Sequence, residues 1–291
     1  MKVDLSSTAT ALREFHANWQ NRLEQEIDDI VSFGADLVLS DIPYLPIEAA
    51  NKIGIPSVAI ASLSWDHVLA AYFPLENSEP LSWWKKMRSS YAKATIALLP
   101  EPSIMGDTFP AWKSIPPLTV KGNIKKDELR RDLKLSYNDQ RPVVLVSLGG
   151  IPSHTLPIEN LKKNKQFHWL LDCETPKGYA HLHSISWLGG WPFRTISASV
   201  DCIVSKPGYG MSVAAAVDSV PYIYVCRGKF PDEKIIGRWM QKNNRAKEID
   251  SNSFRSGEWC DTITELLQKQ PPKPPPFNGP EIAAECIQGL L

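Results

Sequence analysis

Residues 201–221, DCIVSKPGYGMSVAAAVDSVP, constrain the fold of this chain more than any other segment. The apolar run 202–204 leads into a lysine and a glycine-containing turn. A helix of small residues follows, and then a second apolar run at 222–225. This order predicts two parallel strands joined by a helix. Backbone N–H groups at the start of such a helix attract anions, so the turn predicts a phosphate-binding site.

Apolar runs alternate with helical patterns along the rest of the chain, which predicts an α/β protein with parallel sheets. The expected strands are 36–40, 57–61, 95–99, 142–148 and 166–171. The expected helices are 9–33, 46–53, 64–73, 81–92, 125–133, 193–198, 232–242, 256–268 and 281–290. The proline-rich stretch 100–120 shows no periodicity.

The two strand series predict two facing Rossmann-like domains with a boundary near Gly122. We expect an N-terminal domain at 1–122 and a C-terminal domain at 123–270. We expect residues 271–291, a proline spacer and a last helix, to pack back on the N-terminal domain. Ligands of such sheets bind beyond the carboxyl ends of the strands, so the site is expected there.

Composition excludes several classes of function. The chain has 32 basic and 32 acidic residues and a formal net charge of zero, which argues against nucleic acid as a partner. Its apolar stretches are too short for a transmembrane helix, and its first residues lack the apolar core of a signal peptide, so we expect a cytoplasmic protein. The five scattered cysteines predict reduced thiols, and the six histidines show no metal-ligand spacing.

Four segments together carry a resemblance to a known family. They are LVLSDIPYLPIEAANKIGIPSVAIASLSWDHVLAAY (37–72), VVLVSLGGIPS (143–153), DCIVSKPGYGMSVAAAVDSVPYIYVCRGKFPDEKII (201–236) and NGPEIAAECI (278–287). In this order they resemble GT-B glycosyltransferases, and more narrowly the glycosyltransferase-like N-terminal region of plant L-arabinokinases and their free-standing bacterial relatives. The resemblance implies transfer of a sugar from a nucleotide-diphosphate sugar, a co-substrate that needs no further cofactor and no metal. It implies no sugar-kinase activity.

The chain departs from this family in two places. The family begins with a strand and a glycine-histidine-rich turn, whereas this chain begins in a helix, so we expect an N-terminal domain that lacks its first βαβ unit. A second copy of the chain is then a candidate partner that covers the exposed sheet edge. Where the family has Thr and Glu after its GYG turn, this chain has Met211 and Ala214.

The candidate donor-binding residues follow the expected strands of the C-terminal domain. They are Gly149, Gly150, Ser153, Lys206, Gly208, Tyr209, Gly210, Arg227, Asp232 and Glu233. Glycines allow close approach to a diphosphate, Lys206 adds positive charge, and carboxylates accept hydrogen bonds from sugar hydroxyls. The structural alternatives are tight turns that need glycine for positive φ, and an acidic pair that favours a helix N-terminus.

Asp41 and Asp66 are the candidate catalytic residues, because inverting transfer needs a base that deprotonates the acceptor. The alternatives for them are a helix N-cap and an ordinary exposed carboxylate. The tryptophan-rich segment 186–193 is interpreted as core packing or as a surface that stacks on a base or a sugar. The competing hypothesis for the whole chain is a catalytically inactive protein that binds a nucleotide or a partner. A redox protein of Rossmann type is disfavoured because no G-x-G-x-x-G follows the first strand.

Overall fold

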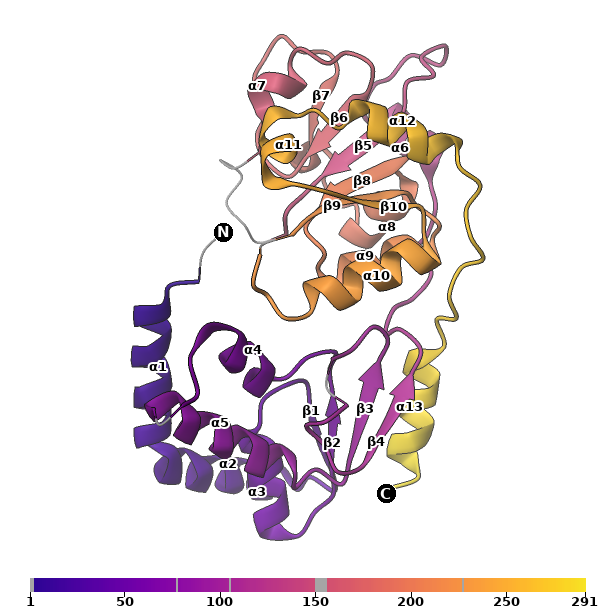
Figure 1. Ribbon diagram of the computed structural model, residues 1–291. Helices are drawn as coiled ribbons and strands as arrows, with labels where there is room; N and C mark the ends of the chain where they lie inside the picture. The colour runs from indigo at the N-terminus through magenta and orange to yellow at the C-terminus, as the bar shows by residue number, and fades with distance from the viewer. Residues whose placement is uncertain (1–2, 77, 105, 150–155, 227) are drawn as a thin grey trace. The chain divides into compact units, whose positions relative to one another are not determined.

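The computed structural model describes residues 3–76, 78–104, 106–149, 156–226 and 228–291 (Figure 1). The chain forms two compact units. Unit 1 comprises Met1–Leu118, Gly228–Ile235 and Asn278–Leu291, and unit 2 comprises Thr119–Arg227 and Ile236–Phe277. Each unit contains one parallel sheet with helices on both faces, which confirms the α/β class.

The sheet of unit 1 has four parallel strands in the order β1-β2-β3-β4. They are β1 (Val38–Ser40), β2 (Ser57–Ile60), β3 (Ile96–Pro100) and β4 (Trp112–Ile115). Among the described strands β1 pairs with β2 alone and therefore forms an edge. Strand β4 was not predicted, because three of its four residues are exposed and it therefore lacks a continuous apolar pattern.

Helices cover the two faces of this sheet with different apolar residues. One face is covered by α1 (Leu5–Ala17), α2 (Trp19–Phe33), α3 (Leu45–Ile53), α4 (Trp65–Tyr72) and α5 (Glu79–Tyr91). On the other face, Val58, Leu98 and Ile115 form a buried cluster with Ala283 of α13 (Gly279–Gln288). Figure 1 shows α13 beside β3 and β4.

The first helical segment differs from the expected single helix over 9–33. The structure has two helices that meet at Asn18, whose φ and ψ of −96° and 19° leave the helical region. The Asn18 side chain donates to the Glu14 carbonyl at 3.1 Å. Asparagine side chains compete with the backbone for such hydrogen bonds, which explains the break.

The sheet of unit 2 has six parallel strands in the order β10-β9-β8-β5-β6-β7. They are β5 (Val143–Val146), β6 (His168–Leu171), β7 (Leu182–Ser184), β8 (Cys202–Ser205), β9 (Tyr222–Val225) and β10 (Ala246–Ile249). The chain progresses from β5 toward one edge and then, from β8, toward the other. The strand order therefore reverses between β5 and β8, and crevices for ligands form at such a point.

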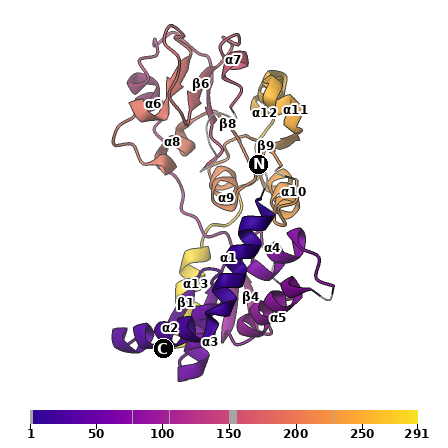
Figure 2. The same ribbon diagram turned by 90° about the vertical axis from the view of Figure 1, so that its left-hand side faces the viewer.

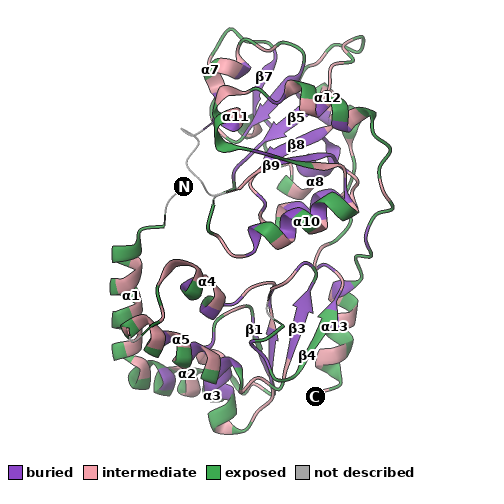
Figure 3. Cartoon of the chain, viewed as in Figure 1, coloured by how far each residue is buried: buried purple, intermediate pink, exposed green. Residues whose placement is uncertain are grey.

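Both faces of this sheet are buried. Successive strand residues point to opposite sides, and all four residues of β5 and of β8 are buried. Val144 and Val146 pack with α7 (Ile158–Leu161), α11 (Ser251–Ser256) and α12 (Cys260–Gln268). Val143 and Leu145 pack with α6 (Lys126–Asp132), α8 (Phe193–Ser199), α9 (Tyr209–Val217) and α10 (Glu233–Asn243). Figure 2 shows α6 and α8 on one side of the sheet and α11 and α12 on the other, and Figure 3 shows its strands as buried.

The expected helix 256–268 begins later than predicted. Gly257 has a φ of 69° and ends α11, and α12 starts at Cys260. A left-handed glycine is a common helix stop, and the prediction overlooked it. Within the described residues, no helix combines the length and the apolar character needed to cross a membrane.

Candidate functional site

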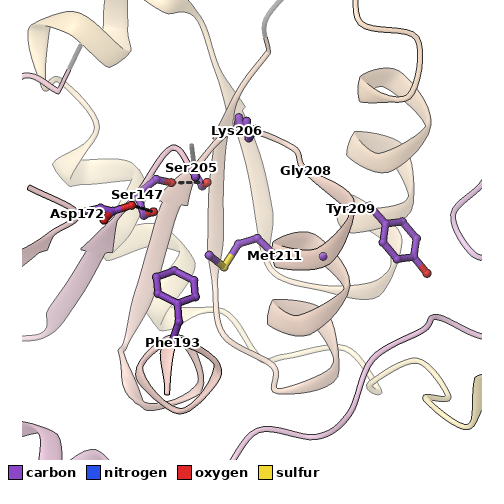
Figure 4. A pocket seen from close by; sticks show the side chains of 10 residues that line it. Ser147, Asp172, Phe193, Ser205, Lys206, Gly208, Tyr209 and Met211 are labelled. Atoms are coloured by element: carbon purple, nitrogen blue, oxygen red, sulfur yellow. Dashed lines mark hydrogen bonds between the residues drawn. The ribbon is translucent and has the colours of Figure 1, made fainter. Parts of the chain in front are cut away.

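A cavity of about 400 Å³ lies in unit 2 where the strand order reverses (Figure 4). The segments that end β5, β6 and β8 contribute to it, together with the start of α8 and of α9. Its described lining consists of Ser147, Gly149, Asp172, Phe193, Ser205, Lys206, Gly208, Tyr209, Gly210 and Met211. The volume falls in the usual range for small-molecule sites.

The turn between β8 and α9 brings a helix N-terminus to this cavity. Gly208 is the N-cap residue of α9, and among the described residues no side chain forms a capping hydrogen bond there. The first N–H groups of a helix lack partners within the helix and carry the positive end of its dipole. This end of the cavity is therefore suited to an anion.

Gly208 and Gly210 are not required by backbone conformation. Gly208 has a φ of −88°, and Gly210 is absent from the glycines with positive φ. Among the residues that the structure describes, and apart from its chain neighbours and its own helix backbone, none lies within 4 Å of a β-carbon built at Gly210. The alternative of a turn that needs glycine for positive φ is therefore wrong at both positions. What their small size provides is open space beside the helix N-terminus.

Hydrogen bonds connect the strand ends that line the cavity. The Tyr222 hydroxyl donates to the Lys206 carbonyl at 2.6 Å, and Ser205 Oγ donates to the Ser147 carbonyl. Burial raises the pKa of Tyr222 to about 12, so its hydroxyl keeps the proton that it donates at neutral pH. The Ser205 bond holds the end of β8 against the end of β5, and the Tyr222 bond ties β9 to the segment that follows β8.

Five lining residues were not among the candidates from the sequence, namely Ser147, Asp172, Phe193, Ser205 and Met211. Asp172 directly follows β6, and Ser147 Oγ donates to its Oδ2 at 2.9 Å. Phe193 begins α8, and 42% of its surface is exposed. Asp172 could have been found, because it is a polar residue at the carboxyl end of an expected strand. Phe193 belongs to the tryptophan-rich segment but was not singled out in it.

The cavity brings together Gly149, Lys206, Gly208, Tyr209 and Gly210 from the predicted donor-binding set. The Tyr209 side chain points away from the other labelled side chains in Figure 4, so its backbone is the part closer to the cavity. Gly150, Ser153 and Arg227 lie outside the described residues.

Asp232 and Glu233, the predicted contacts of a donor sugar, are buried at the start of α10, with 5% and 2% exposure. Glu233 Oε2 accepts a hydrogen bond from the Gly228 N–H at 3.1 Å. A contact of either residue with a donor sugar stays a prediction.

The candidate catalytic residues of unit 1 have different environments. Asp41 follows β1 and is exposed. Asp66 lies in the first turn of α4, is fully buried, and accepts hydrogen bonds from Ser64, from Arg88 at 3.1 Å and from Thr108 at 3.2 Å. A carboxylate held in this way cannot reach an acceptor hydroxyl without rearrangement.

Solved structures with the same architecture define the class of fold. The calicheamicin glycosyltransferase matches 100% of this chain and 82% of its own, with a TM-score of 0.65 and 13% identity. A UDP-glucose:anthocyanidin 3-O-glucosyltransferase, solved in complex with UDP, matches 89% of this chain and 71% of its own, with a TM-score of 0.55 and 13% identity. The chain thus has the GT-B fold of glycosyltransferases.

The sequence resemblance is narrower. L-Arabinokinase of Arabidopsis thaliana is 27% identical over 278 residues, which cover 91% of this chain and 25% of that protein. The resemblance stated from the four segments is therefore confirmed, and this chain spans a quarter of its curated relative's length. No protein-family model matches the chain.

Proposed function

We propose that the chain binds a nucleotide-diphosphate sugar in the cavity of unit 2 and transfers the sugar to an acceptor hydroxyl. The main support is the cavity itself, because it lies where the strand order reverses and joins a helix N-terminus to a lysine. Glycosyl transfer is also what the names of proteins with this fold describe.

The diphosphate would lie against the first turn of α9, with Lys206 supplying a positive charge. Both features stabilise the negative charge that grows on the leaving diphosphate during transfer. Gly208 and Gly210 leave room for the phosphates to approach the backbone. The proposal includes no metal, and it leaves the donor-sugar contacts of Arg227, Asp232 and Glu233 as predictions.

A second candidate function is nucleotide binding without transfer. The full burial of Asp66 favours it, because this removes one of the two candidate bases from contact with solvent. Ala214 on α9 also favours it, because it is buried and has no polar group where the family has a glutamate.

Calorimetric titration of the full chain with UDP, GDP and their sugars tests the proposed binding. We expect Lys206→Met to weaken nucleotide affinity by about tenfold or more, since a hydrogen bond to a charged group contributes about 1.5–3 kcal/mol. Lys163→Met changes an exposed lysine outside the cavity lining and is the matched control.

A second assay distinguishes sugar transfer from nucleotide binding without transfer. It measures the release of free nucleotide from a bound nucleotide-sugar, with and without a panel of hydroxyl acceptors. Turnover supports transfer, whereas binding without any turnover supports the second candidate. A folded protein that binds none of these nucleotides contradicts both.

A further inference from the structure

Among the described residues that line the cavity, one is acidic, and it is Asp172. A carboxylate repels phosphate, so it has no use at the end of the cavity that suits a diphosphate. Figure 4 shows Asp172 and Ser147 on one side of the cavity and Lys206 and Gly208 on the other. The cavity therefore has one cationic end and one end that accepts hydrogen bonds.

The position of Asp172 in the sheet indicates what the second end accepts. Strand β5 ends near Gly149, and the neighbouring parallel strand β6 ends at Leu171, directly before Asp172. In nucleotide-binding sheets with this strand order, an acidic residue about 20 residues beyond the first glycine turn binds a ribose hydroxyl. Asp172 lies about 20 residues beyond Gly149, which follows the first strand of this sheet.

Its side chain is held for such a contact. Ser147, which is fully buried, donates from Oγ to Asp172 Oδ2 at 2.9 Å. Within the described residues, Oδ1 accepts no hydrogen bond. One carboxylate oxygen is thus anchored to the end of β5, and the other can accept a hydrogen bond from a ligand hydroxyl.

Phe193 adds an apolar surface to the same cavity, with 42% of its surface exposed. The cationic end suits the diphosphate, the apolar ring suits the base, and the hydroxyl acceptor suits the ribose. Together they match the three chemical parts of a ribonucleoside diphosphate. The α9 helix, Tyr209–Val217, contains no Asp or Glu that could bind the ribose.

We propose that Asp172 binds the ribose hydroxyls of the nucleotide and makes the cavity selective for ribonucleotides over deoxyribonucleotides. This inference rests on the proposed function. Ser147 is a positioning residue that orients the Asp172 carboxylate. The ribose contact thereby comes from the strand β6 rather than from the helix that follows the glycine turn.

Calorimetric titration with UDP, 2′-deoxy-UDP and pyrophosphate tests the assignment on the full chain. Wild-type protein is expected to bind UDP about tenfold or more tightly than its 2′-deoxy analogue, since the lost bond is to a charged group. Asp172→Ala should weaken UDP binding by a similar factor and abolish this difference. The affinity of the Asp172→Ala variant for pyrophosphate, which has no ribose, should be unchanged or higher, because the variant lacks a carboxylate that repels phosphate.

Asp261→Ala, which removes an exposed carboxylate of α12, is the matched control, and thermal unfolding shows whether each variant is folded. Ser147→Ala should lower the preference for UDP over 2′-deoxy-UDP without weakening pyrophosphate binding. Equal binding of UDP and its deoxy analogue, with no effect of Asp172→Ala, overturns the inference and leaves the proposed function standing. An effect of Asp172→Ala on UDP-sugars but not on UDP assigns the carboxylate to the donor sugar and also overturns it. Absence of any nucleotide binding removes the proposed function and this inference together.

Discussion

Acidification is expected to destabilise unit 2 through a buried pair of histidines. His168 and His183, on the neighbouring strands β6 and β7, have 1% and 4% exposure, and His168 Nδ1 lies 3.0 Å from His183 Nε2. His168 Nε2 lies 2.9 Å from a carboxylate oxygen of Asp139. Because that carboxylate only accepts, His168 donates from Nε2 and, when neutral, accepts at Nδ1 from His183. The pair therefore fits this environment in its neutral form.

Burial lowers the pKa of His183 from 6.5 to about 4, and the positive charges of His168, His181 and Arg141 act in the same direction. The unfolded chain takes up this proton at a higher pH than the folded chain. Stability is therefore fully present above pH 6.5 and is lost as pH falls toward the folded pKa. The full difference corresponds to about 3 kcal/mol, of which about 2 kcal/mol is lost between about pH 7.5 and about pH 5.

The pKa of His168 is lowered as well, with burial outweighing the favourable effect of Asp139, so it changes stability in the same sense. His183→Gln isolates the contribution of His183, since its side-chain amide can still donate to His168 but does not titrate. Urea unfolding followed by tryptophan fluorescence should show the variant losing about 2 kcal/mol less than the wild type across this pH window. Equal losses in the two proteins would refute the reasoning.

Three further substitutions test the packing of the two units, each measured by urea unfolding. Lys93→Met should destabilise the chain by about 2 kcal/mol because Glu48, which is 3% exposed, loses an ion pair; an unchanged unfolding midpoint would contradict this. Gly279→Ala should cost about 1–3 kcal/mol, because a β-carbon there would lie 2.2 Å from a backbone carbonyl oxygen; Gly289→Ala, with its nearest atom at 3.6 Å, is the control and should cost less. Trp259→Ala should cost about 3–5 kcal/mol, because this fully buried ring packs in the core of unit 2; a loss below about 1 kcal/mol would be inconsistent with that burial.

Helices and strands were predictable where neighbouring residues in the sequence show a clear apolar pattern. The strands β5 and β8 are buried on both faces and therefore show continuous apolar runs. The strands β4 and β10 mix exposed and buried residues at sheet edges, and this pattern has too little contrast to distinguish a strand from a loop. The break at Asn18 depends on one side-chain hydrogen bond, which no periodicity shows.

The site was predictable to the same extent. The glycine turn and Lys206 are contiguous, so they were found as a motif. Asp172 and Phe193 are single residues in separate segments, and they reach the cavity only because β6 pairs with β5 and α8 precedes β8. The burial of Asp66 depends on Arg88 and Thr108, which lie far from it in the sequence.

The packing of α13 on the first sheet has a consequence for the order of folding during synthesis. Val58, Leu98 and Ile115 leave the ribosome long before residues 279–288 exist to cover them. Unit 2 contains all six of its strands before that helix is made, so the later unit can finish folding first. A chain whose translation stops at the proline run would carry an uncovered apolar sheet face and would be a natural substrate for chaperones and proteases.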